Sequence, residues 1–501
     1  MKNSMILAAF AAIAFTSLVF SGCVSENANQ GAPEIVGETF QFSSSVPICN
    51  EIYKLAIEEV KSNIRDNGSG GKYFVAGEGY DQLWTRDASY SIKLALGLLY
   101  PEISKSTLEY CTEVPDGKRI ALQDSCGHFG GWPYLTDAIV WATGAWEFYK
   151  IANDRDFLAY SYDVIKNSLA HAENDAFDSQ DGLFKGCSSF MESNSAYPID
   201  YAFNGQKVGA AKVLSTNALY YNAYKIANLM GQSLGAPVEE TDALAEKAEK
   251  LSLAINENLW IEESGFYAYY KDENGALSDR MEGLGEALVV LFGIADEERA
   301  AKVLESTYVS DYGIPCLWPQ FTEWILFEYD PFDETVGYDM ARYNDPDYYH
   351  NGQIWPFVMG YWALGAAKYD RVDLFAHELD ALSELTKSGG TFMEFYITNG
   401  GKVDGSRTQL WSEAGYLAMI YQGIFGMNFE EEGISFDLCV PSEFKGETRL
   451  SNIPYRNAIL NITIHDSGLN IAKFAIDGKE QNEKSISGDI SGTHSIEIWM
   501  N

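Results

Sequence analysis

The feature that most constrains the fold of this chain is the spacing of its apolar residues, which is helical from about residue 45 to 428. Apolar side chains recur at spacings of three and four residues, which is typical of amphipathic helices. Several segments have small and aromatic residues on nearly every face, as inner helices of a large α fold do. The clearest segments are 48–64, 88–99, 137–152, 216–231, 240–260, 285–295, 352–369, 374–387 and 412–427. The sequence therefore predicts a large all-α domain with long loops between its helices.

The pattern changes after about residue 433. The segments 458–468, 469–477 and 495–500 alternate apolar with polar residues and are rich in β-branched side chains, with Gly, Asn and Asp between them. A small C-terminal β appendage over 431–501 is expected.

Composition supports a large domain and limits its partners. The chain has 501 residues, of which 46% are hydrophobic and 14% aromatic, enough for a sizeable core. Aromatic residues suit a core, and they also suit stacking against sugar rings. The net charge of −37 repels nucleic acid and anionic lipid, so no nucleic-acid partner is expected.

The N-terminus is typical of an exported bacterial lipoprotein. Lys2 precedes a short apolar run over 5–20, and Cys23 follows Ser-Gly, as in a lipobox. An ordinary secretory signal is the alternative. The expected organisation is a signal peptide over 1–22, a lipidated Cys23 with a tether over 23–40, and a helical domain over 41–430. The protein is then expected to be membrane-anchored through Cys23, in the periplasm or on the outer surface of a Gram-negative-type bacterium.

The remaining cysteines show no metal-binding spacing. Export permits disulfides, but buried thiols fit scattered cysteines equally well. A metal at His350 would need further ligands at suitable spacing, and the sequence offers none. Asp345 and Asp347 leave calcium open, although such a segment is more often a turn. No metal or cofactor is therefore predicted. The cysteines after Cys23 are Cys49, Cys111, Cys126, Cys187, Cys316 and Cys439.

The segment WTRD, residues 84–87, places an Arg-Asp pair where a loop meets a helix. Asp87 suits a helix cap and Arg86 suits an ion pair with it, which is the structural interpretation. The functional interpretation is a sugar clamp, because the pair offers donors and acceptors to adjacent hydroxyls while Trp84 offers a stacking face. The two interpretations are about equally supported by this segment alone.

Two glutamates lie in aromatic-rimmed loops that are far apart in sequence. Glu394 stands in TFMEFY, residues 391–396, and Glu192 stands in SSFMESNSAYP, residues 188–198. Hydrolysis of a glycosidic bond needs one carboxylic acid to protonate the leaving oxygen and a second carboxylate to activate water or to attack. The first must hold its proton and the second must stay ionised. Glu192 and Glu394 are candidates for such a pair.

These motifs resemble those of known carbohydrate-active families. WTRD resembles the substrate clamp of the glucoamylases, glycoside hydrolase family 15. The segments YYHNGQIWP (348–356) and F-x-E-x-Y (392–396) with QLWS (409–412) resemble the C-terminal half of glycoside hydrolase family 63, which includes processing α-glucosidases and bacterial mannosylglycerate hydrolases. The resemblance covers most of the span from about residue 80 to 428. It implies an all-α (α/α)6 toroid of six helical hairpins with the site at one mouth.

The resemblance also implies roles for individual residues. Glu394 is implied as the general base of an inverting glycosidase. The acid element of the family is less closely matched, since Glu192 stands where an Asp is usual and one residue is inserted; Glu192 is preferred, with Asp200 and Asp137 in reserve. Glu413 replaces a usual Ala and is expected to be structural. The expected sugar-contacting residues are Trp84, Arg86, Asp87, His128, Trp132, Asp137, His350, Asn351, Trp355, Gln409 and Trp411.

The expected function is an inverting, exo-acting α-glucosidase acting on oligosaccharides. One alternative is another chemistry on the same fold: a phosphorylase, a lyase or an unsaturated glucuronyl hydrolase. A phosphorylase uses phosphate in place of the basic carboxylate, and the acidity of the chain suits anionic polymers poorly. A non-catalytic glycan-binding lipoprotein is the other alternative.

Overall fold

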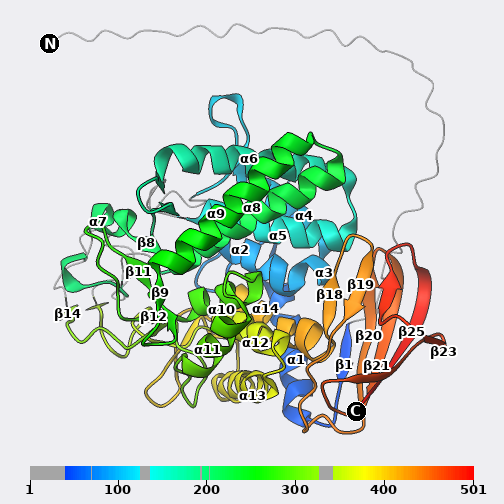
Figure 1. Ribbon diagram of the computed structural model, residues 1–501. Coiled ribbons are helices and arrows are strands. Elements are labelled where there is room, and N and C mark those ends of the chain that lie inside the picture. The colour runs from blue at the N-terminus through cyan, green and yellow to red at the C-terminus, as the bar shows by residue number, and fades with distance from the viewer. Residues whose placement is uncertain (1–39, 69, 124–135, 192–194, 202–203, 327–341) are drawn as a thin grey trace, which may run out of the picture. The chain divides into compact units, whose positions relative to one another are not determined.

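The computed structural model describes the chain in segments, namely residues 40–68, 70–123, 136–191, 195–201, 204–326 and 342–501. The chain divides into two units, Met1–Val36 and Gly37–Asn501, and only the second contains described residues. In that unit helices dominate up to Ile424 and strands dominate after it (Figure 1). The expected lipidation site Cys23 and the candidate site residues His128, Trp132 and Glu192 lie outside the described residues.

A first set of helices is buried on nearly every face, and each contacts the next until the last returns to the first. These are called the inner helices. In order of contact they are α2 (Thr85–Ser91), α5 (Asp137–Ala152), α8 (Leu214–Leu234), α10 (Gly283–Phe292), α12 (Pro356–Lys368) and α14 (Leu410–Ala418). α2 continues through a π-helical turn, η1 (Ile92–Leu96), into α3 (Gly97–Leu99), and α14 continues into η5 (Met419–Ile424).

A second set of helices buries one face only, and each member packs against an inner helix. In chain order these outer helices are α1 (Pro47–Ser62), α4 (Pro101–Tyr110), α6 (Arg155–Asp175), α9 (Val238–Asn258), α11 (Glu297–Ser306) and α13 (Val372–Gly389). α8 and α9 lie side by side in Figure 1, as their extensive contacts require. The large helical domain expected from the apolar periodicity is confirmed.

Local sequence explains where these helices begin and end. Pro47, Pro101 and Pro356 occupy first-turn positions, where a missing N–H costs nothing. Asp154 caps α6 by accepting the backbone N–H groups of Asp156 and Phe157.

Short two-stranded pairs join many of the helices. All are antiparallel, and several lie just before an inner helix. They are β2 (Ile64–Asp66) with β3 (Lys72–Phe74), β4 (Thr112–Glu113) with β5 (Ile120–Ala121), β6 (Phe177–Asp178) with β7 (Leu183–Phe184), β8 (Lys212–Val213) with β11 (Tyr270–Lys271), β9 (Trp260–Ile261) with β10 (Phe266–Tyr267), β12 (Met281–Glu282) with β13 (Leu317–Trp318), β14 (Ile325–Leu326) with β15 (Arg342–Tyr343), and β16 (Phe395–Ile397) with β17 (Lys402–Asp404).

The C-terminal β region contains a six-stranded sheet in the order β1-β20-β21-β25-β22-β23 and a three-stranded sheet in the order β18-β19-β24. Only β21 and β25 run parallel within these sheets. The strands are β1 (Gln41–Ser43), β18 (Met427–Phe429), β19 (Gly433–Phe436), β20 (Glu447–Tyr455), β21 (Asn457–His465), β22 (Ile471–Ile476), β23 (Lys479–Gln481), β24 (Ser485–Ser487) and β25 (Ser491–Met500). The C-terminal sheet region is as expected, but β1 comes from the start of the predicted helical domain and pairs with β20.

The helix predicted over 352–369 begins later, at Pro356. The residue before a proline is pushed away from the helical conformation. Ile354 instead exchanges backbone hydrogen bonds with Tyr396, its N–H donating at 2.9 Å and its carbonyl accepting at 2.8 Å. The apolar residues Ile354 and Trp355 therefore lie before the helix, where Ile354 forms a bridge to the loop that carries Glu394.

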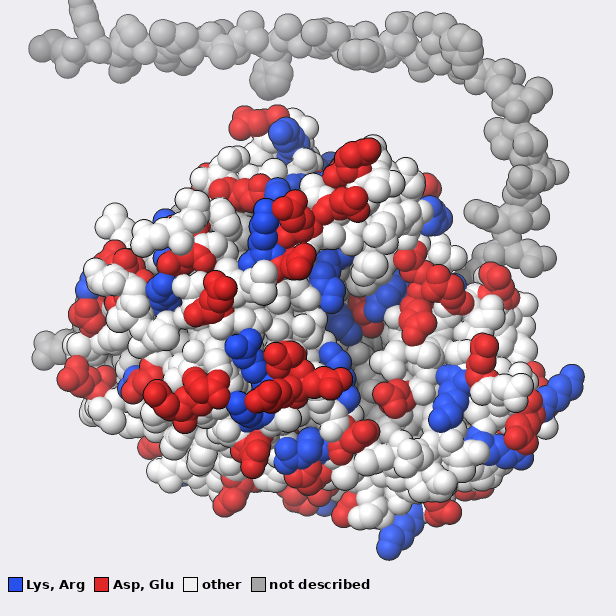
Figure 2. Space-filling view, viewed as in Figure 1, with Lys and Arg blue, Asp and Glu red and all other residues white. Residues whose placement is uncertain are grey.

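Acidic side chains are spread over the face shown in Figure 2, with Lys and Arg lying between them. Among the described residues, no helix is long and apolar enough to cross a membrane.

Candidate active site

Arg86 and Asp87 lie in the first turn of α2, where they meet the start of α5. Nη1 of Arg86 is 3.5 Å from Oδ1 of Asp137, the first residue of α5, and Nε of Arg86 is 3.9 Å from Oδ2 of Asp87. All three residues are buried. Two segments that the sequence separates by about 50 residues thus bring a guanidinium and two carboxylates together at the N-terminal ends of adjacent inner helices.

Gln409 connects this cluster to the loop that carries Glu394. It stands just before α14, and its Nε2 donates to Oδ1 of Asp87 at 3.3 Å. Its backbone N–H donates to the carbonyl of Phe392 at 3.1 Å. The WTRD segment and the TFMEFY segment, predicted independently from the sequence, therefore meet through one glutamine.

The side chain of Glu394 accepts hydrogen bonds from a backbone N–H and from a tyrosine hydroxyl. It is only 4% exposed, and its Oε2 accepts the N–H of Ser406 at 2.9 Å and the hydroxyl of Tyr80 at 3.5 Å. Its own N–H donates to the carbonyl of Ser406 at 2.7 Å. These donors stabilise an ionised carboxylate.

Gly405 passes close to this carboxylate in a left-handed conformation, with φ of +79°. A Cβ at this position would lie 2.7 Å from Oε2 of Glu394. Both the conformation and the space therefore require glycine.

Tyr80 is a site residue that the sequence motifs did not indicate. It lies in the loop before WTRD, and its ring meets that of Trp84 edge to face at 6.2 Å. The charge of Glu394 raises the pKa of Tyr80 well above its ordinary value, and burial adds to the effect. The phenol therefore stays protonated and remains a donor. The only sequence signal was its position shortly upstream of Trp84.

The predicted aromatic residues form a buried layer behind Glu394. Trp355 stacks on Phe395 at 5.5 Å, and Trp411 stacks on Phe357 at 4.3 Å. Trp355 and Trp411 are buried, so they support the site from behind. Trp84 is half-buried.

His350 lies in the same layer and is buried. Its ring is 4.8 Å from that of Trp355. Burial lowers the pKa of His350 well below its ordinary value, and the charge of Arg86 adds to this. The imidazole is therefore neutral near pH 7.

Asn351 organises two loops with its side chain. Its amide accepts the N–H of Phe321 at 2.8 Å and donates to the carbonyls of Phe321 and Asn344 at 3.0 and 2.8 Å. Sequence reasoning placed this amide at the sugar; in the structure it joins the segment around 321 to the segment around 344.

The described residues on either side of 192–194 are firmly anchored. Ser188, four residues before Glu192, donates its hydroxyl to Oε1 of Glu282 at 2.5 Å. Oε2 of Glu282 also accepts the N–H of Ser215 at 2.8 Å. Burial raises the pKa of Glu282 to about 7, against hydrogen bonds from Ser188 and Ser215.

On the other side, the Asn344 amide accepts the N–H of Ala196 at 2.9 Å and donates to the carbonyl of Tyr197 at 2.6 Å. Ala196 has φ of +94°, which this anchoring maintains. No motif in the sequence indicated Glu282 or Asn344 as anchors. Asp200, a reserve candidate for the acid, is exposed and forms an ion pair with Lys207.

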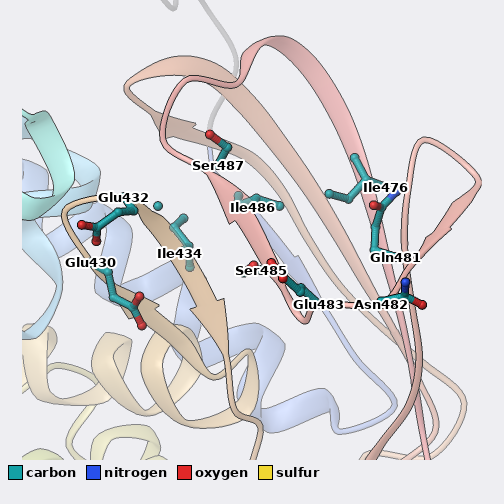
Figure 3. Close-up of a pocket in the computed structure, with 11 residues that line it drawn as sticks. Glu430, Glu432, Ile434, Ile476, Gln481, Asn482, Glu483, Ser485, Ile486 and Ser487 are labelled. Atoms are coloured by element: carbon teal, nitrogen blue, oxygen red, sulfur yellow. The ribbon is translucent and has the colours of Figure 1, made fainter.

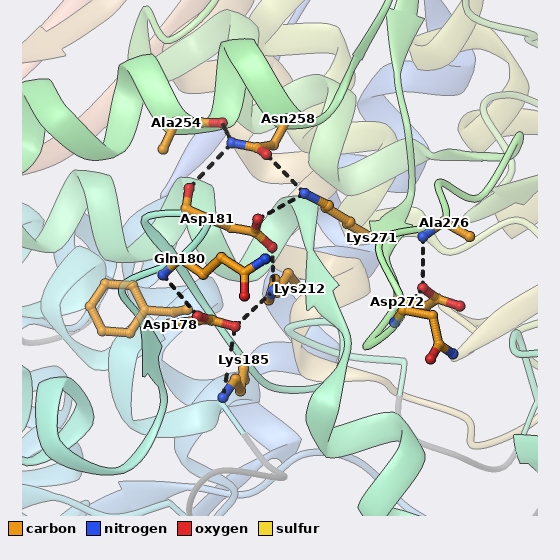
Figure 4. Close-up of polar contacts among 12 residues, drawn as sticks. Asp178, Gln180, Asp181, Lys185, Lys212, Ala254, Asn258, Lys271, Asp272 and Ala276 are labelled. Carbon is orange, nitrogen blue, oxygen red and sulfur yellow. Dashed lines mark hydrogen bonds and ion pairs between the residues drawn. The ribbon is translucent and has the colours of Figure 1, made fainter.

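The segment leading to this region is fixed by a network of ion pairs around the buried Lys212, shown in Figure 4. Lys212 in β8 pairs with Asp178 at 2.9 Å and with Asp181, and Lys271 in β11 pairs with Asp181 at 2.9 Å. Burial opposes ionisation of Asp181, but hydrogen bonds from both lysines lower its pKa below the usual value. The network attaches residues 178–181 to the strand that enters α8.

Asp345 and Asp347, the two candidates for a calcium site, are joined by a hydrogen bond: Oδ1 of Asp345 accepts the N–H of Asp347 at 3.1 Å, as in an Asx turn. Over the described part of the chain, no group of three or more His, Cys, Asp or Glu side chains is arranged to hold a metal ion. Cys49, Cys316 and Cys439 are buried thiols.

A cavity of about 660 Å³ lies in the C-terminal strands (Figure 3). Its lining combines the carboxylates of Glu430, Glu432 and Glu483 with isoleucines such as Ile434 and Ile486. None of the predicted site residues contributes to it. It is separate from the cluster around Arg86 and Glu394.

One family model matches the chain over residues 134–412, more than half of its length; its description is mannosylglycerate hydrolase MGH1-like glycoside hydrolase domain. A sequence relative is the mitochondrial neutral/alkaline invertase 1 of Oryza sativa subsp. japonica. It is 26% identical over 162 residues, which are 32% of this chain and 25% of the invertase.

Solved structures share the fold. The GH78 family rhamnosidase of Bacillus sp. GL1 matches with a TM-score of 0.61 and 16% identity, over 93% of this chain and 44% of the rhamnosidase. The GH63 mannosylglycerate hydrolase from Thermus thermophilus, in complex with Tris and D-glycerate, matches with a TM-score of 0.57 and 18% identity, over 74% of this chain and 100% of that protein. The chain spans a quarter of the invertase and less than half of the rhamnosidase.

Proposed function

The chain belongs to the family of mannosylglycerate hydrolase MGH1-like glycoside hydrolase domains, and from this premise we propose that it hydrolyses a glycosidic bond with Glu394 as the general base. The observation that carries the proposal is the setting of Glu394. Its carboxylate is almost buried, receives donors from Ser406 and Tyr80, and belongs to a loop joined through Gln409 to the Arg86–Asp87 cluster.

The proposed mechanism is an inverting displacement. Glu394 removes a proton from a water molecule, which attacks the anomeric carbon from the face opposite the leaving group. Glu192 is proposed as the general acid that protonates the leaving oxygen, and inverting pairs are typically separated by about 6.5–9.5 Å. The anchoring of Ser188 by Glu282 and of Ala196 by Asn344 favours a fixed path for the chain on both sides of that segment.

The cluster at the start of α2 and α5 is suited to holding the sugar. Arg86 is a donor-only group and the carboxylates of Asp87 and Asp137 are acceptors, so together they match adjacent hydroxyls. Trp84 is half-buried at the edge of the cluster and offers a ring face for stacking. His128 and Trp132 remain proposed wall residues.

We infer that the inner helices, whose contacts run in a closed ring, form the inner layer of an (α/α)6 toroid. The candidate residues Asp87, Asp137 and Gln409 support this, because they stand at the N-terminal ends of inner helices, as does the anchoring residue Glu282. A fold does not fix a function, so the assignment depends on the side chains of the site.

The proposed substrate is an oligosaccharide with an α-linked terminal glucose, cleaved in an exo manner. A second candidate is an α-mannoside of glycerate, favoured by the family match and by the fold shared with the Thermus mannosylglycerate hydrolase. Both substrates would be hydrolysed by the same proposed pair of carboxyl groups, and they differ in the sugar that is released, glucose or mannose, and in the leaving group.

The test is hydrolysis by the purified protein of maltose, kojibiose, nigerose, mannosylglycerate and p-nitrophenyl glycosides, with and without phosphate. Proton NMR of the first-formed sugar gives its anomeric configuration. Release of the β-anomer from an α-glycoside supports the proposal. An α-anomer would contradict inversion, and cleavage only with phosphate would identify a phosphorylase.

We also propose that Cys23 is lipidated and anchors the protein to a bacterial membrane. Metabolic labelling with a radioactive fatty acid tests this directly. The wild-type protein is expected to carry label and C23A is expected to carry none; equal labelling of both would refute the proposal.

A further inference from the structure

The loop that carries Glu394 rests on the last turn of the outer helix α1. Glu59 accepts the N–H of Phe392 on its Oε2 at 3.0 Å. One helical turn later, Nδ2 of Asn63 donates to the carbonyl of Thr408 at 2.7 Å. Asn63 directly follows α1 and stands four residues after Glu59, so the C-terminal end of α1 contacts both ends of the loop.

The two ends of the loop are also bonded to each other. The N–H of Thr408 donates to Oγ1 of Thr391 at 3.2 Å, and the N–H of Gln409 donates to the carbonyl of Phe392 at 3.1 Å. Residues 391–392 and 408–409 thus form a narrow neck, and Glu394 lies just beyond it. A shift of the neck moves the Glu394 carboxylate with it.

Glu413 on α14 completes the support beneath this neck. It is buried, and Nδ2 of Asn63 donates to its two oxygens at 3.3 and 3.4 Å. No Lys or Arg among the described residues forms an ion pair with it. Burial raises the pKa of Glu413 well above its ordinary value, and the charge of Glu59 adds to this. Glu413 therefore holds a proton more readily than an ordinary carboxyl group, and its oxygens orient the Asn63 amide.

The groups that face Glu59 come from the loop itself, from the segment before α2 and from α14, where the charge of Glu59 acts on Glu413. Burial raises the pKa of Glu59, while hydrogen bonds from Phe392 and Thr391 lower it. Arg407 lowers it further and Glu78 raises it. The N–H of Phe392 is the one described backbone donor to this carboxylate, so the contact at the neck is also where the charge of Glu59 is stabilised.

We propose that Glu59 and Asn63 are positioning residues for Glu394: they fix the neck of its loop from α1 and so hold its carboxylate where it can activate water. They do not touch the reacting atoms. The inference rests on the proposed function, because it concerns the loop of the proposed base.

The test compares E59A, E59Q and N63A with the wild-type protein by steady-state kinetics and by hydrogen exchange of the peptides covering 391–396 and 406–409. In E59A the acceptor at the neck is lost. We expect faster exchange in both peptides and a fall in kcat of roughly tenfold to a hundredfold with little change in KM, because a misplacement of about 1 Å can cost that much. E59Q keeps an acceptor for Phe392 and is expected to restore most of kcat.

The matched control is E378A. Glu378 is also a buried carboxylate on an outer helix, α13, and it accepts the N–H of Ile314 at 3.1 Å, away from the neck. E378A is expected to lower stability without faster exchange in 391–396 or 406–409. If E59A does not fold, N63A removes the other contact and is expected to show the same pattern.

Exchange in E59A that is unchanged at the neck, or that is raised by the same factor throughout the protein, would overturn the proposal. So would a failure of E59Q to restore kcat. If the wild-type protein hydrolyses none of the glycosides tested, the proposed function fails, while the exchange measurements still decide whether α1 holds this loop.

Discussion

The hydroxyl of Tyr80 lies 3.5 Å from Oε2 of Glu394 and joins the loop before WTRD to the loop of the proposed base. Because the charge of Glu394 raises the pKa of Tyr80, this phenol is a donor over the whole working pH range. It is a direct contact between two regions that the family motifs indicate separately.

Replacing Tyr80 by phenylalanine removes this donor and keeps the ring. We expect kcat/KM to fall by roughly tenfold, because a hydrogen bond to a charged group contributes about 1.5–3 kcal/mol and this contact is at the weak end. Y308F is the control, since Tyr308 is an exposed tyrosine that stacks on Trp318. Equal kcat/KM values for Y80F and the wild-type protein would show that the contact has no role in turnover.

The glycines of the Glu394 loop offer a second test with a built-in control. Gly405 and Gly400 both have positive φ, +79° and +91°, so alanine strains the backbone at each. Only at Gly405 would the new Cβ meet Oε2 of Glu394; at Gly400 nothing lies within 4 Å. We expect G405A to lower kcat by roughly a hundredfold and G400A to leave it within about twofold, because displacement of a reacting group by about 1 Å has effects of that size. Similar kcat values for the two variants would mean that backbone strain, and not displacement of the Glu394 carboxylate, determines the effect of alanine in this loop.

The buried Glu282 predicts a pH-dependent stability. Its pKa is raised by burial to about 7 in the folded protein, above the ordinary carboxyl value, so the folded state holds this proton more tightly than the unfolded state. Its contribution to the free energy of unfolding is therefore fully present below about pH 4.5 and declines as pH rises to about 7.

The measurement is urea unfolding of wild-type protein and E282Q at pH 5 and pH 8. Glutamine does not titrate, so E282Q is expected to gain stability relative to the wild type by about 2–3 kcal/mol between the two pH values. A constant difference at both pH values would show that Glu282 is ionised throughout.

The network of Lys212 with Asp178 and Asp181 predicts a large loss of stability on neutralisation of the lysine. K212M removes the cation that Asp178 and Asp181 share, and we expect a loss of about 1.5–3 kcal/mol, because both carboxylates are partly exposed and keep Lys185 and Lys271 as partners. K250M is the control, because Lys250 pairs with Glu246 on the exposed surface of α9, where solvent screens the pair and its loss is expected to have little effect. A K212M effect as small as that of K250M in urea unfolding would show that the network is not structural.

Much of the helical architecture follows from apolar spacing, and the loop that carries Glu394 was indicated by its motif. The apolar spacing wrongly predicts a helix at Ile354. This residue instead forms a β-bridge to Tyr396, because the residues before Pro356 are disfavoured in a helical turn. A sequence motif also does not show which groups a side chain contacts in the folded protein. Asn351 suited a sugar by its chemistry, but its amide is occupied by Phe321 and Asn344.

The contacts that complete the site are long-range. Tyr80 and Glu394 are separated by 314 residues, and Asn63 and Glu413 by 350. No periodicity or local motif encodes such pairs, because they depend on how the inner helices close on one another. Glu282 is similar: its sequence neighbours give no reason for a buried acid, and only the fold shows Ser188 and Ser215 around it.

The central claim is that Glu394 is the base of a hydrolase. The most direct measurement is kcat/KM of E394Q on the best glycoside substrate, with urea unfolding to establish that the variant is folded. Glutamine keeps the shape and an acceptor for Ser406 but cannot take a proton, so kcat/KM is predicted to fall by about 10²–10⁴-fold. A folded E394Q that retains kcat/KM within about tenfold of the wild type would contradict the assignment.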